Sequence, residues 1–449
     1  MLPPTEKYVL RPPPHCPITP PNTYLLLKRS LYGLQRAPKL WYNKLVSILK
    51  QIGLQPCPHA PCLFTGKILP NEPPIYVGAY VDDCIYFSNS DAVEQAFQQK
   101  LTSILDGKIT FMGNISHFLG IKFDHYRDKH NNITMHMSQT AFIDTLVESA
   151  GLSNSNSVIT PFRSGFPIDK IKPPSTTATA SNIQQMRHLI GSLLWISQST
   201  RPDITTITNL LSTYQSNPSP QHIAAAKRII QYLKGTSTFG ITFTQQPGDS
   251  TAAYLNFPID HHLPTALCDS NWGPHDQSKP SPLTKNETYE LYKSRSTSGY
   301  VIMMSGGPIA WSSKRQKITA RSSAEAEIYA TDECTKNILH IQHIRQDLHF
   351  SNSHNSCPIY NDNAACVQWA HNCTSKGLRH IQIRENAVRE SILTNRITVS
   401  HIAGNINLGD IFTKEDKDSS HFLELRSHLV REIPFTFCST PCSPKQCST

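Results

Sequence analysis

The spacing of apolar positions along the chain predicts a protein built from helices and strands together. Apolar side chains three or four residues apart, as at Trp41, Leu45 and Leu49, indicate amphipathic helices. This pattern predicts helices over residues 25–53, 91–105, 138–149, 183–198, 202–214, 220–234, 323–348, 363–371 and 380–393. Short runs rich in β-branched and aromatic residues indicate strands. They are expected over residues 62–65, 75–87, 266–268, 300–304, 308–311, 358–360 and 396–402, and within residues 109–137.

The order of these elements predicts an α+β fold with more than one domain. The length of 449 residues favours two or three domains. From near Thr265 onward, strands come first and helices then alternate with strands, which is typical of a mixed sheet with helices packed on it. Residues 154–182 are rich in Ser, Thr and Pro and predict a linker, and no clear element is expected after residue 430.

The composition favours an acidic partner. The chain has 42 Lys and Arg against 33 Asp and Glu, a net charge of +9, which suits nucleic acid or an anionic membrane surface. The sequence contains no signal peptide and no apolar run of 18 residues, so neither secretion nor a membrane span is expected. None of the 12 Cys has zinc-finger spacing, and the cluster of Cys438, Cys442 and Cys447 lacks a fourth ligand.

Two adjacent aspartates, Asp82 and Asp83, interrupt an apolar run that is rich in β-forming residues. Like charges about 4 Å apart repel by about 4 kcal/mol at an effective dielectric constant of about 20. A divalent cation would remove this repulsion, and carboxylate oxygens suit Mg²⁺. A hairpin turn that exposes both aspartates to water explains the same residues equally well. The residues alone leave both interpretations open.

Four further acids stand where the pattern places the ends of elements: Asp269, Glu327, Asp362 and Asp410. Carboxylates that converge from separate elements can hold two magnesium ions, one to activate water and one to stabilise the leaving oxygen of a phosphodiester. Each acid by itself equally suits a solvated surface position. Their spacing along the chain does not decide whether they converge.

Longer motifs around the paired aspartates resemble the polymerases of copia-type retrotransposons. The Tyr-x-Asp-Asp pattern at residues 80–83 is similar to the metal-binding turn of reverse transcriptases. Residues 27–42 are similar to a copia-type signature that helps to hold the incoming nucleotide and the template. The resemblance implies metal binding and catalysis by Asp82 and Asp83. It also implies nucleotide or nucleic-acid contacts by Tyr32, Gly33, Gln35, Arg36, Pro38 and Tyr80.

The chain departs from this family in one respect that matters for polymerisation. The family's polymerases use a third metal-binding aspartate, on a strand that precedes the segment at residues 27–42, and that strand is absent here. Two-metal transfer needs ligands for both ions. The resemblance therefore implies that this chain alone has lost polymerase activity.

A second set of motifs is similar to the ribonuclease H domain of copia-type elements. The matching blocks occur in the same order as in that family, at residues 296–300, 309–316, 322–329, 359–363 and 410–414. The family's catalytic and metal-binding set, Asp-Glu-Asp-Asp, carries over to Asp269, Glu327, Asp362 and Asp410. Glu327 is preferred to Glu325 because it precedes an Ile-Tyr-Ala stretch, as the family's catalytic glutamate precedes its apolar neighbours.

The two resemblances together imply a domain organisation. A truncated reverse-transcriptase palm is expected at residues 1–125, and a mostly helical thumb or connection at residues 126–245. A ribonuclease H-like α/β domain with a mixed five-stranded sheet is expected at residues 262–425, followed by a tail at residues 426–449.

The implied function is hydrolysis of the RNA strand in RNA–DNA hybrids, with two Mg²⁺ ions per active site, or Mn²⁺ in their place. Asn363 and Ser270 are candidates for contacts with 2′-hydroxyls, and His401 is a candidate base for product release. The implied partners are the hybrid, template RNA, a DNA primer and an upstream Pol polyprotein, in the cytoplasm within virus-like particles or in the nucleus. The alternative is a catalytically inactive transposon remnant that at most binds nucleic acid.

Overall fold

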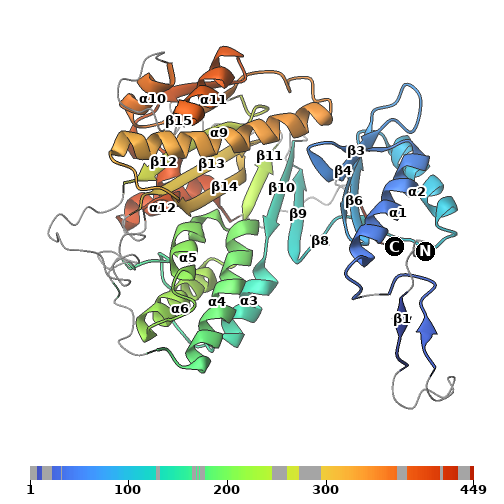
Figure 1. Ribbon diagram of the computed structural model, residues 1–449, viewed down its shortest axis with the longest axis horizontal. Coiled ribbons are helices and arrows are strands. Elements are labelled where there is room, and N and C mark those ends of the chain that lie inside the picture. The colour runs from blue at the N-terminus through green and yellow to red at the C-terminus, as the bar shows by residue number, and fades with distance from the viewer. Residues whose placement is uncertain are drawn as a thin grey trace. The chain divides into compact units, whose positions relative to one another are not determined.

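The structure, a computed structural model, divides into two compact units, Met1–Ile115 with Pro441–Thr449 and Ser116–Thr440 (Figure 1). The residues that it describes are 8–12, 23–31, 33–127, 132–163, 168, 171, 177–244, 260–272, 295–371, 382–414, 418–432 and 445–448. None of the helices in these ranges has the length and apolar character needed to cross a membrane.

The first unit is a six-stranded sheet covered by two helices, α1 (Ala37–Ile52) and α2 (Asp91–Ile104). The strands lie in the order β3 (Gln55–Cys57), β4 (Ala60–Gly66), β5 (Ile75–Tyr80), β6 (Asp83–Ser88), β17 (Lys445–Ser448) and β7 (Thr110–Asn114). Leu49 of α1 and Phe97 of α2 pack in one core with Phe64 and Tyr86 of the sheet. A separate ladder joins β1 (Val9–Leu10) to β2 (Leu25–Leu26).

Two features of this sheet differ from the sequence prediction. The run at residues 75–87, predicted as a single strand, folds back on itself into β5 and β6, with Tyr80 paired to Asp83. Hairpin turns usually carry Gly or Asn-Gly at the positions with positive φ. Here Val81 occupies such a position, with a φ of 57°, so the turn has no sequence signal. The residues after 430, predicted to carry no element, supply β17, whose Lys-Gln-Cys-Ser sequence has no apolar alternation to reveal it.

The second unit begins with an antiparallel sheet and a group of packed helices. The sheet order is β11 (Ile241–Thr244), β10 (Ile133–Ser138), β9 (Ile121–Arg127) and β8 (His117–Phe118). The helices are α3 (Thr140–Ser149), α4 (Ala180–Ser199), η2 (Pro202–Ile204), α5 (Thr205–Ser212) and α6 (Pro220–Gly235). Pro202 and Pro220 lie in the first turns of their helices, where the missing N–H of proline costs no hydrogen bond.

Two basic side chains of α6 hold the loop that precedes α4. Lys234 donates to the carbonyl oxygens of Ser153 and Ser155 at 2.6 and 2.7 Å. Arg228 donates to the carbonyl oxygen of Phe162 at 2.9 Å. Both cationic side chains thus donate hydrogen bonds to backbone carbonyls, so Arg228 and Lys234 have a structural role.

The rest of the second unit is built on a mixed five-stranded sheet, which confirms the α+β class and the expected sheet. Its order is β14 (Gly307–Arg315), β13 (Thr297–Met304), β12 (Thr265–Asn271), β15 (Cys357–Asn361) and β16 (Ile397–His401). The strands β14, β13 and β12 run antiparallel, whereas β12, β15 and β16 run parallel to one another. The carboxyl ends of β12 and β15 therefore meet at one edge.

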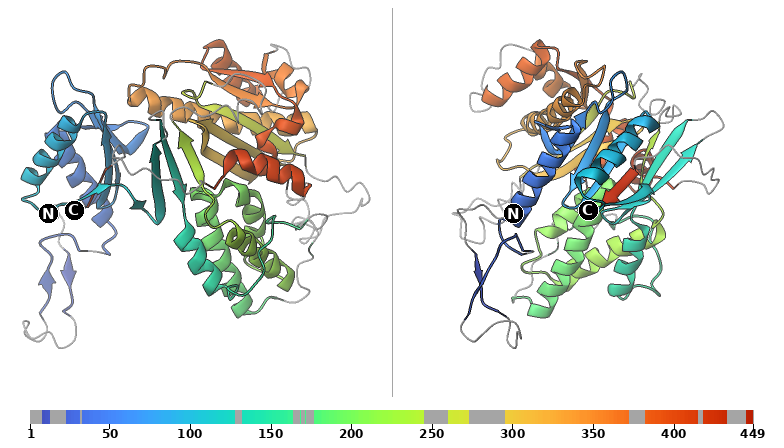
Figure 2. Two further views of the ribbon diagram at one scale, coloured as in Figure 1. Left: turned by 180° about the vertical axis from the view of Figure 1, so that it is seen from behind. Right: turned by 90° about the vertical axis from the view of Figure 1, so that its right-hand side faces the viewer.

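Helices cover both faces of this sheet (Figures 1 and 2). Ala266 and Cys268 of β12 face a core shared with α9 (Ser323–Asp347), α10 (Ala364–His371) and α11 (Gln382–Leu393). Leu267 faces the opposite core, shared with α4, α5, α6 and α12 (Ser419–Leu429). This alternation is the period of two that a strand buried on both faces requires. The expected domain limits at residues 125, 245 and 425 stay a prediction, since the structure separates two units only.

Candidate functional site

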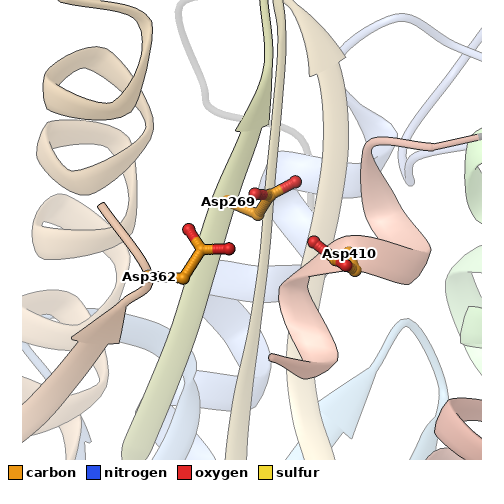
Figure 3. Close-up of side chains that lie close together, drawn as sticks. All are labelled: Asp269, Asp362 and Asp410. Atoms are coloured by element: carbon orange, nitrogen blue, oxygen red, sulfur yellow. The ribbon is translucent and has the colours of Figure 1, made fainter. Parts of the chain in front are cut away.

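Three aspartates from separate elements meet at the edge where β12 and β15 end (Figure 3). Asp269 lies on β12, Asp362 directly follows β15, and Asp410 lies on the short helix η4 (Leu408–Phe412). One carboxylate oxygen of each lies within 4.8 Å of those of the other two, and together these three residues form the acid cluster. Asp269 and Asp410 are 2% and 1% exposed, so the acid cluster is largely shielded from water.

The approach of η4 to β12 is set by Gly409. A Cβ atom at this position would lie 2.9 Å from the carbonyl carbon of Cys268 and 3.0 Å from the backbone nitrogen of Asp269. Asn407 fastens the same approach, since its amide donates to the Cys268 carbonyl oxygen at 2.9 Å and its Oδ1 accepts from the Gly409 backbone N–H at 2.9 Å. Asp410 is therefore brought to the cluster by backbone packing and one buried amide.

The fourth expected acid, Glu327, lies beside the acid cluster but is not one of its members. It is 5% exposed, and it accepts from the Ser270 backbone N–H at 3.2 Å and from the Asn361 amide at 2.9 Å. Burial, together with the nearby charge of Asp269, raises the pKa of Glu327 from its ordinary 4.5 to about 9, against the lowering effect of the Asn361 hydrogen bond. The buried position thus disfavours the charged form of Glu327.

Asn361 is an organising residue that the sequence prediction missed. It is fully buried, and its amide nitrogen donates to Glu327 and to the Cys268 sulfur. Its Oδ1 accepts from the backbone N–H of Asn363 at 2.8 Å. One side chain thus links the end of β15, the strand β12 and the helix α9. The signal that could have found it is its place directly before Asp362, within the block at residues 359–363.

Cationic and hydroxyl groups surround the acid cluster. The ammonium of Lys414 lies 2.5 Å from Asp410 and 3.6 Å from Asp269, and the Thr413 hydroxyl donates to Asp269. Burial and then the charge of Asp269 raise the pKa of Asp362, whereas Lys414 acts in the opposite direction. His421 of α12 lies 3.8 Å from Asp410. Lys414 and Thr413 lie in the predicted Asp-Ile-Phe-Thr-Lys block, whereas nothing in the sequence pointed to His421.

The remaining candidates near this edge have partners of their own. Glu325 accepts from the backbone N–H of Arg321 at 2.7 Å and from the Tyr329 hydroxyl at 3.2 Å, so it stabilises the start of α9. Asn363 accepts from the Cys366 backbone N–H and so caps α10. The His401 ring lies 3.0 Å from the carbonyl oxygen of Asp362.

Ser270 differs from these candidates. Its Oγ is buried and has no hydrogen-bond partner within the described residues.

The other aspartate pair lies in the turn between β5 and β6, where Asp82 is exposed and Asp83 half-buried. The indole N–H of Trp41, in the first turns of α1, donates to the Val81 carbonyl oxygen and fixes this turn. In the described part of the chain, the metal-ligand geometry found at the acid cluster does not recur around this pair. The hairpin turn is present as one interpretation of the sequence expected, and metal binding by the pair stays a prediction.

The expected nucleic-acid contacts of this unit lie at the start of α1 and beside the turn. Gln35, Arg36, Pro38 and Tyr80 are exposed, as is Gly33, whose φ is +93°. Tyr32 lies outside the described residues, as do Cys438 and Cys442, and the side chain of Cys447 is not described.

Comparison with known proteins places these features in a family. The sequence model described as "Reverse transcriptase (RNA-dependent DNA polymerase)" matches residues 5–164. The Pol polyprotein of transposon TNT 1-94 from Nicotiana tabacum is 26% identical over 391 residues, which cover 86% of this chain and 27% of the relative. A putative transposon Ty5-1 protein from Saccharomyces cerevisiae is 27% identical over 336 residues, which cover 74% of this chain and 95% of the relative.

The structural neighbour RNase H1 from Halobacterium salinarum is 14% identical, with a TM-score of 0.23, and covers 34% of this chain and 96% of the neighbour. The chain spans about a quarter of the length of the polyprotein relatives from Nicotiana tabacum and Arabidopsis thaliana. The family match over residues 5–164 and the polyprotein similarity along most of the sequence agree. The chain belongs to the copia-type retrotransposon reverse transcriptases.

Proposed function

We propose that the second unit is a ribonuclease H that hydrolyses the RNA strand of RNA–DNA hybrids, using Asp269, Glu327, Asp362 and Asp410. The observation that carries this proposal is the convergence of three aspartate oxygens within 4.8 Å, at the edge of a mixed sheet. Acids at such a distance repel strongly in a buried site. Natural proteins keep such an arrangement where a cation relieves the repulsion.

The donor set fits a pair of hard divalent cations. All its ligand atoms are carboxylate oxygens, which Mg²⁺ and Mn²⁺ prefer over nitrogen or sulfur. The raised pKa of Glu327 is caused first by burial and then by the charge of Asp269, and a bound cation would offset both effects. Bound there, two such ions would supply an activated water and would stabilise the leaving oxygen of the phosphodiester.

The chain's own residues would hold and orient this centre. Asp269 and Asp410 are fixed by buried hydrogen bonds and backbone packing, and so need no reorganisation before reaction. Glu327 is oriented by Asn361 and by the Ser270 backbone N–H. The Ser270 Oγ is buried and has no partner within the described residues, so a hydrogen bond to a 2′-hydroxyl, the group that distinguishes RNA from DNA, would require this atom to become accessible.

Cleavage of a labelled RNA–DNA hybrid in Mg²⁺ tests the proposal. The full chain should cleave the RNA strand and leave the DNA strand and duplex DNA intact, and Asp362→Asn should abolish cleavage. The matched control is Asp347→Asn at the last turn of α9, outside the acid cluster, which should cleave like the parent chain. Equal cleavage by the parent chain and Asp362→Asn would reject the assignment. Absence of cleavage by the parent chain would favour the alternative, an inactive remnant.

We infer further that the first unit does not polymerise by itself. Asp82 and Asp83 lie on one turn, and no third acid forms a metal-ligand group with them among the described residues. Two-metal nucleotide transfer needs more ligands than one such pair offers. A primer-extension assay with Mg²⁺, template RNA and a DNA primer should give no product, and extension by this chain alone would overturn the inference.

A further inference from the structure

Strand β17 fills a slot in the sheet of the first unit, between β6 and β7. On one side it pairs antiparallel with β6, from Lys445 opposite Tyr86 to Ser448 opposite Asp83. On the other side it pairs antiparallel with β7, with Lys445 opposite Asn114. A segment from the last residues of the sequence is therefore an interior strand of a sheet whose other strands all come from the first 115 residues.

The slot has the width of one strand, and its two walls stay in contact below it. Tyr86 of β6 and Phe111 of β7 meet edge to face, with ring centroids 6.4 Å apart. Tyr86 also packs on Phe97 of α2 at 5.0 Å. Shared aromatic packing thus holds β6 and β7 at the separation that admits one more strand.

Without an occupant, both walls would present unpaired backbone groups. Among the described strands, β7 pairs with β17 alone, and β6 pairs with β17 on the edge that faces away from β5. Unpaired N–H and C=O groups at a sheet edge are a template for an added strand. The slot therefore has the properties of a strand-binding groove.

The negative charge of Glu94 at one end of the groove favours an occupant with a basic side chain. The carboxylate of Glu94, on α2, is 6% exposed, and the ammonium of Lys445 contacts it. Glu94 also accepts from the Ser88 backbone N–H at 3.2 Å. A buried carboxylate is costly unless a cation or hydrogen-bond donors compensate it. The groove thus suits an extended segment that carries a basic side chain opposite Glu94.

We propose that the groove between β6 and β7 is a peptide-binding site and that strand β17, Lys445–Ser448, is its exchangeable occupant. Binding is by strand addition, in which main-chain hydrogen bonds supply affinity and the Lys445–Glu94 pair supplies direction and register. The proposal does not depend on the nuclease function, because it concerns the first unit alone. The occupied groove also holds the strand that begins with Asp83.

The direct test uses a chain that ends at residue 440 and a fluorescent peptide of residues 441–449, in reducing buffer. The peptide should bind the shortened chain at least about tenfold more tightly than the full chain, whose groove is filled. A peptide with Cys447→Pro should not bind, since proline lacks the N–H and cannot occupy an interior strand. Equal binding of both peptides, or equal binding to both chains, would overturn the proposal.

Hydrogen exchange on the full chain gives a second measurement if the shortened chain does not fold. In the Cys447→Pro chain, the amides of β6 should exchange at least about tenfold faster, while those of β12 in the other unit keep their rates. Glu94→Gln should increase the exchange rates of the β6 amides less than Cys447→Pro does. Unchanged exchange in β6 of the Cys447→Pro chain would show that β17 does not occupy the groove.

Discussion

The two aspartate sites of this chain differ in how the fold brings their acids together. Asp82 and Asp83 are neighbours in the sequence and share one hairpin turn, where Asp82 is exposed. Asp269 and Asp410 lie far apart in the sequence, yet they share a buried cluster with Asp362. Water screens the first pair, whereas the low dielectric of the second site strengthens every charge interaction within it.

Adjacency in sequence therefore supplies only part of a metal-ligand set. A turn offers two carboxylates and little else, so further ligands must come from elsewhere. Parallel strands that end at one edge, joined there by a short helix, offer acids from several directions at once. We therefore expect substitutions at the two sites to have very different effects.

The largest difference in hybrid cleavage between the two sites should appear when one acid of each site is neutralised. Asp269→Asn should lower hybrid cleavage at least about 100-fold, because even the loss of a group that only orients a metal ligand costs about 10–100-fold. Asp82→Asn, the matched control, should leave cleavage unchanged. Initial cleavage rates in saturating Mg²⁺ measure both, and an equal loss in the two variants would erase the distinction between the sites.

The next effect should come from the residue that orients Glu327. Asn361→Ala removes the amide that donates to Glu327 at 2.9 Å, and should raise the Mg²⁺ concentration for half-maximal cleavage roughly tenfold. Asn337→Ala removes an amide from the same helix α9 that donates only to a backbone carbonyl, and serves as control. A titration with Mg²⁺ that gives the same midpoint for both variants would contradict this role of Asn361.

The charge of the buried site should appear as a pH dependence of stability. The pKa of Glu327 is about 9 in the folded chain and 4.5 without the fold, so the folded state binds the extra proton between these values. In EDTA, the free energy of unfolding should therefore fall as pH rises through this window, by at most about 1.4 kcal/mol per pH unit. In Glu327→Gln, the free energy of unfolding measured by denaturant titration should depend less on pH. If its pH dependence is unaltered, other groups cause it.

The smallest effect should come from Lys414, whose ammonium lies 2.5 Å from Asp410. Lys414→Met removes a positive charge that competes with a bound cation, so half-maximal cleavage should need about two- to fivefold less Mg²⁺, as expected for a partly exposed charge pair. The control is Lys336→Met, which removes the salt bridge between Lys336 and Asp332 on α9. A higher Mg²⁺ requirement in Lys414→Met would show that the ammonium supports the metal.

Particular elements show why part of the fold could be predicted from the sequence. The helix expected at residues 323–348 is α9, Ser323–Asp347, because its cap at Ser322 and its apolar spacing are local signals. The four acids were identified by resemblance, and three of them meet. The turn at Val81 and the strand β17 were missed, because a left-handed valine and a polar four-residue strand have no local signature.

The sequence by itself determined most of the helices, most of the strands and the four acids proposed as catalytic, because capping, periodicity and motifs act over a few residues. Only the tertiary structure decided which acids lie together, that Asn361 orients Glu327, and that residues near 445 complete a sheet begun near residue 55. These depend on strand pairing and backbone approach between distant segments, such as η4 on β12 at Gly409. Interactions of that kind are set by the packing of the whole unit.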